Sequence, residues 1–321
     1  MPKVSVVIPT YNRAHLICET IDSILAQTYK DYEIIVVDDG STDNTQEVLK
    51  RYGDKVRYFY QQNQGQASAW NFAVRQSSGE YIALLDSDDL WLPQKLEWQT
   101  EVLDKNPEIG FVCSEIYAFR ENGTIAHWKK EKSKKENFES MFEGNFIINP
   151  TVLMRKRCFE DVGGFDVKLR TTQDYDLWLR LTRKYKFLYM NIPLVKYRLH
   201  SQNLHKNLKQ KLKDHLFIFS KEENVAHLNL FQRRIKIARE YYDFAPDFVK
   251  QKKYAYAGLC CLKAVVIYPF VGYYYRPKEI HKMRFSMPYR ILKVYFMSIY
   301  YFLKALFARI HFIKGLNIYV Y

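Results

Sequence analysis

Several motifs that define common protein classes are missing from this 321-residue sequence. Its five cysteines are odd in number and none has CxxC spacing, so neither a zinc cluster nor a disulfide framework is indicated. We expect reduced, mostly buried thiols in a cytosolic setting. The glycine signatures GxGxxG and GxxxxGK[ST] are absent too, which argues against a dinucleotide-binding turn and a P-loop.

Targeting signals and long apolar runs are also lacking. The chain starts MPKVSVVIPTYNR, which leads directly into a strand and contains no apolar signal segment with a cleavage site. A membrane-spanning helix needs about 20 mostly apolar residues, and lysines interrupt the apolar stretches near the C-terminus. We therefore expect a cytoplasmic protein.

Acidic residues are scarce in the last part of the chain. Residues 250–321 contain 13 lysines and arginines but one acid, Glu279, so they carry +12 of the formal net charge of +14. Basic segments rich in Tyr and Phe favour anionic partners. We predict interfacial helices that bind the inner face of the cell membrane peripherally. A buried helical cap and a true span are the alternatives.

The first 90 residues alternate between two periods. Apolar runs predict buried strands at 4–9, 33–41 and 80–86, and a further strand is predicted at 56–62. Apolar residues at helical spacing predict helices at 14–27, 42–52 and 66–76. This order predicts an α/β fold, a Rossmann-like and mostly parallel sheet flanked by helices. Further along, the patterns predict a hairpin after 110, a strand, short helix and glycine turn over 151–166, a helix over 171–185 and a strand over 192–200.

Polar clusters follow three of the predicted strands. They are Pro9-Thr10-Tyr11-Asn12-Arg13, Asp38-Asp39-Gly40-Ser41 and Asp86-Ser87-Asp88-Asp89. In parallel sheets ligands bind at the carboxyl ends of the strands, so these clusters are expected to converge on one crevice. The carboxylates of the third cluster raise each other's pKa unless a cation neutralises them. The simpler interpretation of that cluster is an acidic turn that caps the next helix.

Five motifs occur in a specific order: PTYNR, VVDDGSTD, GEYIALLDSDD, GGFD followed by QDYDLWLRL, and YRLH. Together they resemble a family 2 inverting glycosyltransferase of the GT-A fold, of the type that builds bacterial cell-surface polysaccharides. The resemblance covers residues 1–203 and implies a catalytic domain there, followed by a helical, basic extension over 204–321. It implies transfer of a sugar from a nucleoside diphosphate donor, preferably a UDP-sugar, to a cell-surface glycan or lipid-linked acceptor.

The resemblance also implies roles for individual residues. Asp88 would be the main ligand of a Mn²⁺ or Mg²⁺ ion, and His200 would also touch this metal. A divalent cation stabilises the charge of a diphosphate leaving group, and carboxylate oxygens suit such hard cations. The residues expected to bind the nucleotide sugar are Pro9, Tyr11, Asn12, Arg13, Asp39, Arg75, Asp86, Ser87 and Arg198. Among them, Tyr11 would stack on the base, Asp39 would accept a hydrogen bond from it, and Arg198 would close on the diphosphate.

The helix that begins QDYD supplies the implied general base. Asp174 matches the residue that deprotonates the acceptor hydroxyl, and Asp176 is the alternative. Arg180 is expected to pair with one of them, because residues four apart face each other on a helix. The first member of the family's usual acidic pair is Gln173 here.

One departure concerns the helix over 66–76. The family often has Ala-Arg-Asn where this chain has Ala69-Trp70-Asn71. Either Arg75 replaces the missing arginine, or Trp70 changes the packing of the nucleotide base.

Two other functions compete with this interpretation. A nucleotidyltransferase also uses paired aspartates and metal in an α/β sheet, although Asp174 and YRLH do not support it. A nucleic-acid-binding protein would use the basic C-terminal segment, but no recognisable RNA-binding motif is present. We therefore predict no nucleic-acid partner.

Overall fold

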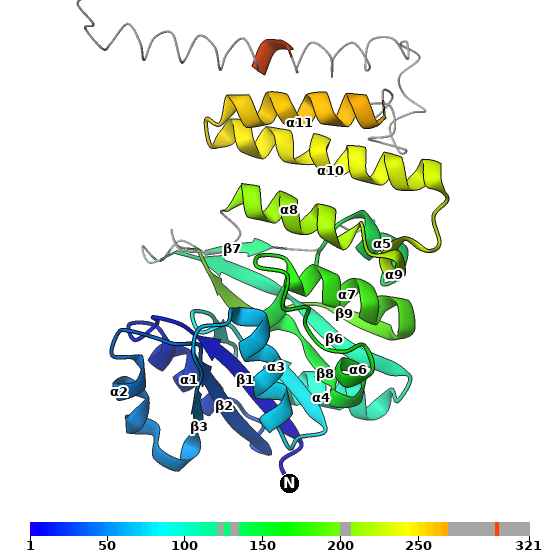
Figure 1. Ribbon diagram of the computed structural model, residues 1–321. Helices are drawn as coiled ribbons and strands as arrows, with labels where there is room; N and C mark the ends of the chain where they lie inside the picture. The colour runs from blue at the N-terminus through cyan, green and yellow to red at the C-terminus, as the bar shows by residue number, and fades with distance from the viewer. Residues whose placement is uncertain (121–122, 124, 129–134, 200–206, 269–298, 302–321) are drawn as a thin grey trace, which may run out of the picture. The chain divides into compact units, whose positions relative to one another are not determined.

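The computed structural model describes residues 1–120, 123, 125–128, 135–199, 207–268 and 299–301. By its internal contacts the chain divides into two compact units, Met1–Leu204 and His205–Tyr321. The first unit contains the motifs described above from PTYNR to YRLH. Figure 1 labels the elements of both units.

A mixed β-sheet forms the centre of the first unit, and nine strands are described in it. Their order across the sheet is β3-β2-β1-β4-β8-β6-β9-β5, with β7 paired to β6. The strands are β1 (Val4–Thr10), β2 (Tyr32–Asp38), β3 (Arg57–Tyr60), β4 (Tyr81–Leu84), β5 (Leu90–Trp91), β6 (Ile109–Phe119), β7 (Ile125–Trp128), β8 (Leu153–Arg155) and β9 (Lys186–Arg198).

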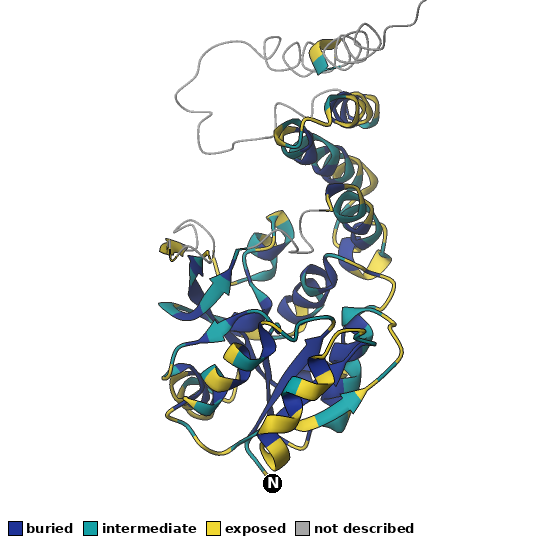
Figure 2. Cartoon of the chain, turned by 90° about the vertical axis from the view of Figure 1, so that its left-hand side faces the viewer, coloured by how far each residue is buried: buried dark blue, intermediate teal, exposed yellow. Residues whose placement is uncertain are grey.

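Helices cover this sheet, and Figure 2 shows that their buried faces turn toward dark blue strands. The helices are α1 (Ile17–Leu25), α2 (Thr45–Leu49), α3 (Gln66–Gln76), α4 (Lys95–Lys105), α5 (Phe138–Glu143), α6 (Lys156–Asp161) and α7 (Gln173–Lys184), with short 3₁₀ turns at Lys50–Lys55 and Asn149–Thr151. Helix α1 illustrates the pattern, because Ile17, Ile21 and Ile24 lie on one face and are fully buried.

The predicted α/β fold class is confirmed, with one difference in detail. Strands β1 to β4 are parallel neighbours, as predicted; β1, β4 and most of β2 are buried, whereas β3 is partly exposed. Beyond β4 the sheet is mixed, because β8 pairs antiparallel with both β4 and β6 and the predicted β6–β7 hairpin is also antiparallel. The predicted glycine turn is present at Gly163 and Gly164, which have φ values of 80° and 71°. The second of these is tightly packed, because a Cβ there would lie 2.6 Å from Asn71 Oδ1.

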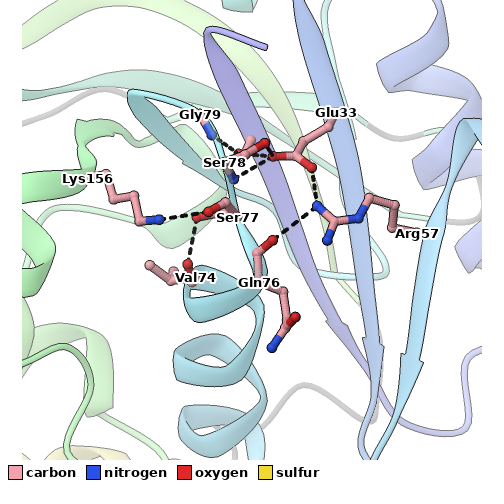
Figure 3. Close-up of polar contacts among 9 residues, drawn as sticks. Glu33, Arg57, Val74, Gln76, Ser77, Ser78, Gly79 and Lys156 are labelled. Atoms are coloured by element: carbon pink, nitrogen blue, oxygen red, sulfur yellow. Dashed lines mark hydrogen bonds and ion pairs between the residues drawn. The ribbon is translucent and has the colours of Figure 1, made fainter. Parts of the chain in front are cut away.

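A polar network fastens the amino-terminal edge of the parallel strands (Figure 3). Glu33 Oε1 accepts hydrogen bonds from Ser78 N and Ser78 Oγ at 2.7 and 2.6 Å, and its other oxygen pairs with Arg57. The last turn of α3 ends here as well: Arg57 Nη1 donates to Gln76 O at 3.0 Å and Lys156 Nζ donates to Ser77 O at 2.7 Å. Cations at this end complement the helix dipole of α3. The opposite end of α3 therefore points to the carboxyl edge of the sheet.

The second unit is helical in its described residues. It contains α8 (Leu208–Ile218), α9 (Glu222–Val225), α10 (Leu230–Lys250) and α11 (Tyr254–Ile267). Helices α8, α10 and α11 share an apolar cluster that includes Leu208, Phe244, Phe248 and Cys261. Of the basic segment 250–321, in which interfacial helices were predicted, residues 269–298 and 302–321 lie outside the described residues, and 299–301 are helical.

Two sequence-based expectations can be compared with the described part of the chain. All five cysteines lie within the described residues and none forms a disulfide, and all except the half-buried Cys18 are buried, as expected. Among the residues described, no helix combines the length and apolar character needed to cross a membrane.

Candidate active site

The first two polar clusters are joined by hydrogen bonds at the carboxyl ends of β1 and β2. Asn12 has a φ of 51°, a conformation that asparagine adopts more readily than most residues. Its backbone N donates to Ser41 Oγ at 2.8 Å, and its Oδ1 accepts from Thr42 N at 2.8 Å. Asn12 therefore holds the PTYNR loop against the loop after β2, which places it in a structural role at the edge of the site.

Asp39 organises a further loop of the site. Its Oδ1 accepts from Gln61 Nε2 and Gln64 N at 2.7 and 2.9 Å, and its Oδ2 accepts from Gly65 N at 2.8 Å. The residue is only 4% exposed. An ionised carboxylate has about four acceptor positions, so most of the capacity of Asp39 is used to hold residues 61–65.

The side chains that follow β1 differ in their exposure. Pro9 is buried in the strand, whereas Tyr11 is 47% exposed. A large aromatic side chain left open beside buried polar groups is able to stack on a planar ligand.

Asp86 and Asp88 lie at the carboxyl end of β4, the strand next to β1. Burial, followed by the negative charges of Asp88 and Asp174, raises the pKa of Asp86 to about 8. Arg13 approaches from the first cluster, with its Nε 3.7 Å from Asp88 Oδ2. The three predicted clusters therefore converge, and their carboxylates are close enough to influence one another.

Arg198 ties the last predicted motif to this turn. Its Nε donates to Asp88 O at 2.8 Å, and its Nη2 donates to Glu19 Oε2 at 2.7 Å. Its backbone N donates to Asp89 Oδ1 at 2.7 Å. The guanidinium carbon also lies 4.7 Å from the centre of the Phe119 ring. Arg198 thus belongs to the same site as Asp88, and the adjoining Ser87 is buried there.

Asp174 reaches the site from α7. It lies in the first turn of the helix, and its charge is among the causes that raise the pKa of Asp86. Asn145 Nδ2 donates to Asp174 Oδ2 at 2.9 Å. The motif at the start of α7 therefore stands close to the aspartates of β4, although more than 80 residues separate them.

Asp176, the alternative base, is occupied elsewhere. Its side chain is completely buried, and Arg180 Nη2 and Nε donate to its Oδ2 at 2.7 and 3.0 Å, which confirms the predicted pairing at four-residue spacing. Arg180 also donates to Gly164 O at 2.7 Å. This ion pair anchors the glycine turn, so Asp176 supports the fold.

The structure does not bring Arg75 to this site. Arg75 is the tenth residue of α3, about 14 Å along the helix from Gln66 at 1.5 Å per residue. Its guanidinium lies 5.7 Å from the ring centre of Phe72, at the edge of the sheet opposite Asp86. Trp70 is fully buried and stacks on Phe165, with 5.8 Å between ring centroids. Neither explanation for the missing family arginine therefore fits, because Arg75 lies too far along α3 and Trp70 is packed in the interior.

Three site residues were missed in the sequence. Asn145 contacts Asp174 from a stretch without clear periodicity, and Gln66 Nε2 donates to Asp86 Oδ1 at 2.8 Å. Burial and the nearby carboxylates of Asp89, Asp86, Asp88 and Asp174 raise the pKa of Tyr197, which therefore remains a neutral phenol. Only Tyr197 had a sequence signal, as the first letter of YRLH.

The aspartate cluster is chemically suited to a divalent cation. Asp86 and Asp88 contribute hard carboxylate oxygens, and burial followed by the charges of Asp88 and Asp174 raises the pKa of Asp86, a cost that a bound cation would offset. Within the described ranges no group of three or more metal-binding side chains is assembled. His200, the other predicted ligand, lies outside those ranges.

Comparison with known proteins identifies the family. The model of "Glycosyl transferase family 2" matches residues 5–163. A glycosyltransferase of Methanocaldococcus jannaschii is 34% identical over 237 residues, which cover 70% of this chain and 81% of that protein. The chain belongs to glycosyl transferase family 2. The order of the five motifs had predicted this family.

Other relatives are matched over a smaller share of their own length. A Rickettsia typhi glycosyltransferase is 37% identical over 210 residues, covering 62% of this chain and 64% of that protein. The chain spans 30 to 65% of the length of the five rickettsial relatives. Chondroitin synthase of Pasteurella multocida is 31% identical over 264 residues, covering 80% of this chain and 26% of the synthase.

Solved structures confirm that the fold is the GT-A fold of glycosyltransferases. S. aureus TarS 1–349 in complex with UDP-GlcNAc has a TM-score of 0.65 and 18% identity, with 91% of this chain and 89% of TarS covered. A mannosyltransferase of Pyrobaculum calidifontis, solved with GDP-Man and Mn²⁺, has a TM-score of 0.56 and 19% identity, with coverages of 95% and 86%.

Proposed function

We propose that this glycosyltransferase moves a sugar from a nucleoside diphosphate donor to a hydroxyl group of a glycan or lipid-linked acceptor, with inversion at the anomeric carbon. The observation that carries the proposal is the meeting of Asp86, Asp88 and Asp174 at one edge of the sheet. Relatives solved with UDP-GlcNAc or GDP-Man support a nucleotide-sugar donor. We favour a UDP-sugar.

In the proposed mechanism, one face of the site holds the donor. The exposed Tyr11 ring stacks on the base, and the remaining acceptor position of Asp39 takes a hydrogen bond from it. Arg13 and Arg198 lie beside Asp88 and offer positive charge to the diphosphate. A Mn²⁺ or Mg²⁺ ion held by Asp88, with Asp86 nearby, would supply further positive charge for the leaving group.

Asp174 supplies the base on the other face. Its carboxylate takes the proton of the acceptor hydroxyl while that oxygen attacks the anomeric carbon and the bond to the diphosphate breaks. The proton ends on Asp174 and the electron pair of the broken bond leaves with the nucleoside diphosphate. Attack from the side opposite the leaving group inverts the anomeric configuration. Asn145, which donates to Asp174 Oδ2, fixes the carboxylate in place.

A thermal-shift screen of sugar nucleotides tests the donor. The correct donor at 100 times its dissociation constant stabilises the folded state by about 2.7 kcal/mol. That corresponds to a rise of roughly 5 °C in melting temperature for a protein of this size. We expect the rise with Mn²⁺ and little of it in EDTA. The proposal would be contradicted if no UDP-, GDP- or dTDP-sugar raised the melting temperature and none was hydrolysed in a metal-dependent way.

We further propose that the basic C-terminal segment brings the enzyme to an anionic membrane surface, near its acceptor. Each Lys or Arg beside such a surface contributes about 1 kcal/mol, so four substitutions should weaken vesicle binding strongly. The test is co-sedimentation of the full chain with phosphatidylglycerol vesicles. The substituted positions, each changed to Gln, are Lys278, Lys282, Arg284 and Arg290.

The matched control changes four exposed lysines of the first unit, Lys30, Lys50, Lys55 and Lys105, to Gln. We expect the control to bind vesicles like the wild type and both proteins to release them as salt rises. Equal binding by the two variants, or no binding by the wild type, would show that the segment does not act at the membrane.

A further inference from the structure

Two glutamines connect the donor side of the proposed site to the helix of the general base. Gln66 Nε2 donates to Asp86 Oδ1 at 2.8 Å, and Gln66 Oε1 accepts from Gln173 Nε2 at 2.7 Å. Gln66 is the first residue of α3 and Gln173 is the first residue of α7. A continuous bridge therefore runs from the end of β4 through α3 to α7, across 107 residues of sequence between the glutamines.

The directions of the two hydrogen bonds fit together at Gln66. Its amide nitrogen faces Asp86 Oδ1, an oxygen that accepts a hydrogen bond. The amide oxygen of Gln66 is then left to face α7, where only a donor satisfies it. Gln173 provides that donor, whereas the acidic residue that the family usually has at this position would place two acceptors against each other.

The surroundings of the bridge favour a role in positioning. Gln173 is only 4% exposed, and its Oε1 has no hydrogen-bond partner in the described structure. The hydrogen bond from Gln173 Nε2 to Gln66 Oε1 therefore fixes the orientation of the Gln173 side-chain amide. No side chain caps either helix, although capping side chains commonly fix the first turn of a helix. The first turn of α7 carries Asp174 directly after Gln173.

Helix α3 has independent attachments that keep the fold intact without the bridge. Asn71 Nδ2 donates to Phe165 O at 2.8 Å, and Asn71 Oδ1 accepts from Phe165 N at 2.9 Å. The carboxyl-terminal end of α3 is fastened by the network of Figure 3. Loss of the glutamine bridge should consequently shift the first turn of α7 without unfolding the domain.

We propose that Gln66 and Gln173 are positioning residues that hold Asp174 at a fixed place relative to Asp86. This inference rests on the proposed function, in which Asp86 lies at the donor and Asp174 at the acceptor. The bridge sets the distance across which the acceptor oxygen meets the anomeric carbon. Displacement of a reacting group by about 1 Å costs up to about 100-fold in rate, so small shifts at α7 have large effects.

The test is a double-mutant cycle with Gln66→Met and Gln173→Met, which keep side-chain length and remove the hydrogen bonds. We expect Gln173→Met to lower kcat roughly 10- to 100-fold while the donor Kd from calorimetry stays within about twofold of the wild type. Gln66→Met should lower kcat at least as far and also weaken donor binding, because it releases Asp86. The double variant should be no worse than Gln66→Met, since both changes break one bridge.

Two further variants separate positioning from a general loss of structure. Gln173→Glu keeps the size of the side chain but removes the donor, and it should be at least as impaired as Gln173→Met. Gln76→Met changes the same residue type in α3, about 15 Å from Gln66 at the carboxyl-terminal end, and should behave like the wild type. Melting temperatures of all variants should remain within a few degrees.

The possible failures are distinguishable. Additive losses in the cycle, full activity of Gln173→Glu, or an equal loss in Gln76→Met would overturn the positioning role while the proposed function stands. An inactive wild type with every sugar nucleotide would instead overturn the proposed function. In that case the inference that Gln66 and Gln173 position Asp174 for catalysis would be wrong as well.

Discussion

Replacing Asp174 with asparagine is expected to reduce sugar transfer by about 100-fold or more, while donor affinity remains nearly unchanged. The amide keeps the shape of the side chain but cannot take the proton of the acceptor hydroxyl, and general-base catalysis contributes about 10²- to 10⁴-fold. The measurement is the initial rate of transfer at saturating donor, together with donor Kd by calorimetry. Asp31→Asn, an exposed change before β2 at the other edge of the sheet, is the matched control.

The alternative base should show a different defect. Asp176 is buried and paired with Arg180, so Asp176→Asn leaves that guanidinium without its counter-charge. Breaking a buried ion pair costs on the order of 3 kcal/mol, and we expect a lower melting temperature with transfer per folded molecule largely retained. If Asp174→Asn turned over like the wild type and Asp176→Asn did not, the two roles would have to be exchanged.

Replacing Asp88 with alanine should abolish metal-dependent donor binding and reduce transfer to background. The reason is that a divalent cation at the diphosphate stabilises leaving-group charge by several kcal/mol, and Asp88 is the proposed main ligand. Calorimetric titration of donor in Mn²⁺ and in EDTA measures the effect. For the wild type the two titrations should differ widely, whereas for the variant they should coincide.

Stability without metal distinguishes this loss from misfolding. Asp88→Ala removes a negative charge that raises the pKa of Asp86, and it also loses the 3.7 Å contact between Asp88 Oδ2 and Arg13 Nε. Relief of the charge repulsion raises the free energy of unfolding, and loss of the partly exposed ion pair lowers it. The ion pair contributes about 1 kcal/mol or less. The melting temperature in EDTA should therefore not fall. Metal-dependent donor affinity equal to that of the wild type would remove Asp88 from the metal site.

The proposed glutamine bridge gives a physical account of how this chain tolerates an uncharged residue before Asp174, the proposed base. An acidic residue at position 173 would need a donor from α3, whereas Gln66 offers its oxygen there because Asp86 takes its amide nitrogen. The identity of residue 173 and that of residue 66 are thus coupled through Asp86. Relatives with an acidic residue at this position are expected to present a donor from the helix that corresponds to α3.

Much of the first unit, Met1–Leu204, could be predicted from local sequence patterns. The apolar runs of β1, β2 and β4 and the apolar spacing in α1 follow directly from burial on both faces or on one face. The three polar clusters were predictable for a similar reason, since each follows a strand of a parallel sheet. The order of the five motifs was sufficient to indicate the family, which the comparisons confirmed.

Side-chain partners could not be predicted in the same way. Arg75 was a reasonable substitute for a missing arginine by sequence distance, but nine residues of helix carry it to the opposite edge of the sheet. Trp70 was a candidate for packing on the base of the nucleotide, but in the structure it is buried against Phe165. The sequence offered two candidates for the general base, Asp174 and Asp176. The ion pair between Asp176 and Arg180 favours Asp174.

The sequence alone determined the elements, the family and the set of polar residues at the strand ends, because those features depend on periodicity and order along one chain. Tertiary structure decided which of these residues meet. Asn145 reaches Asp174 across 29 residues, Gln66 reaches Gln173 across 107, and Arg198 reaches the turn after β4 across 110. Such contacts leave no local periodic trace, since each is fixed by the register of strands and the placement of helix ends that fold around them.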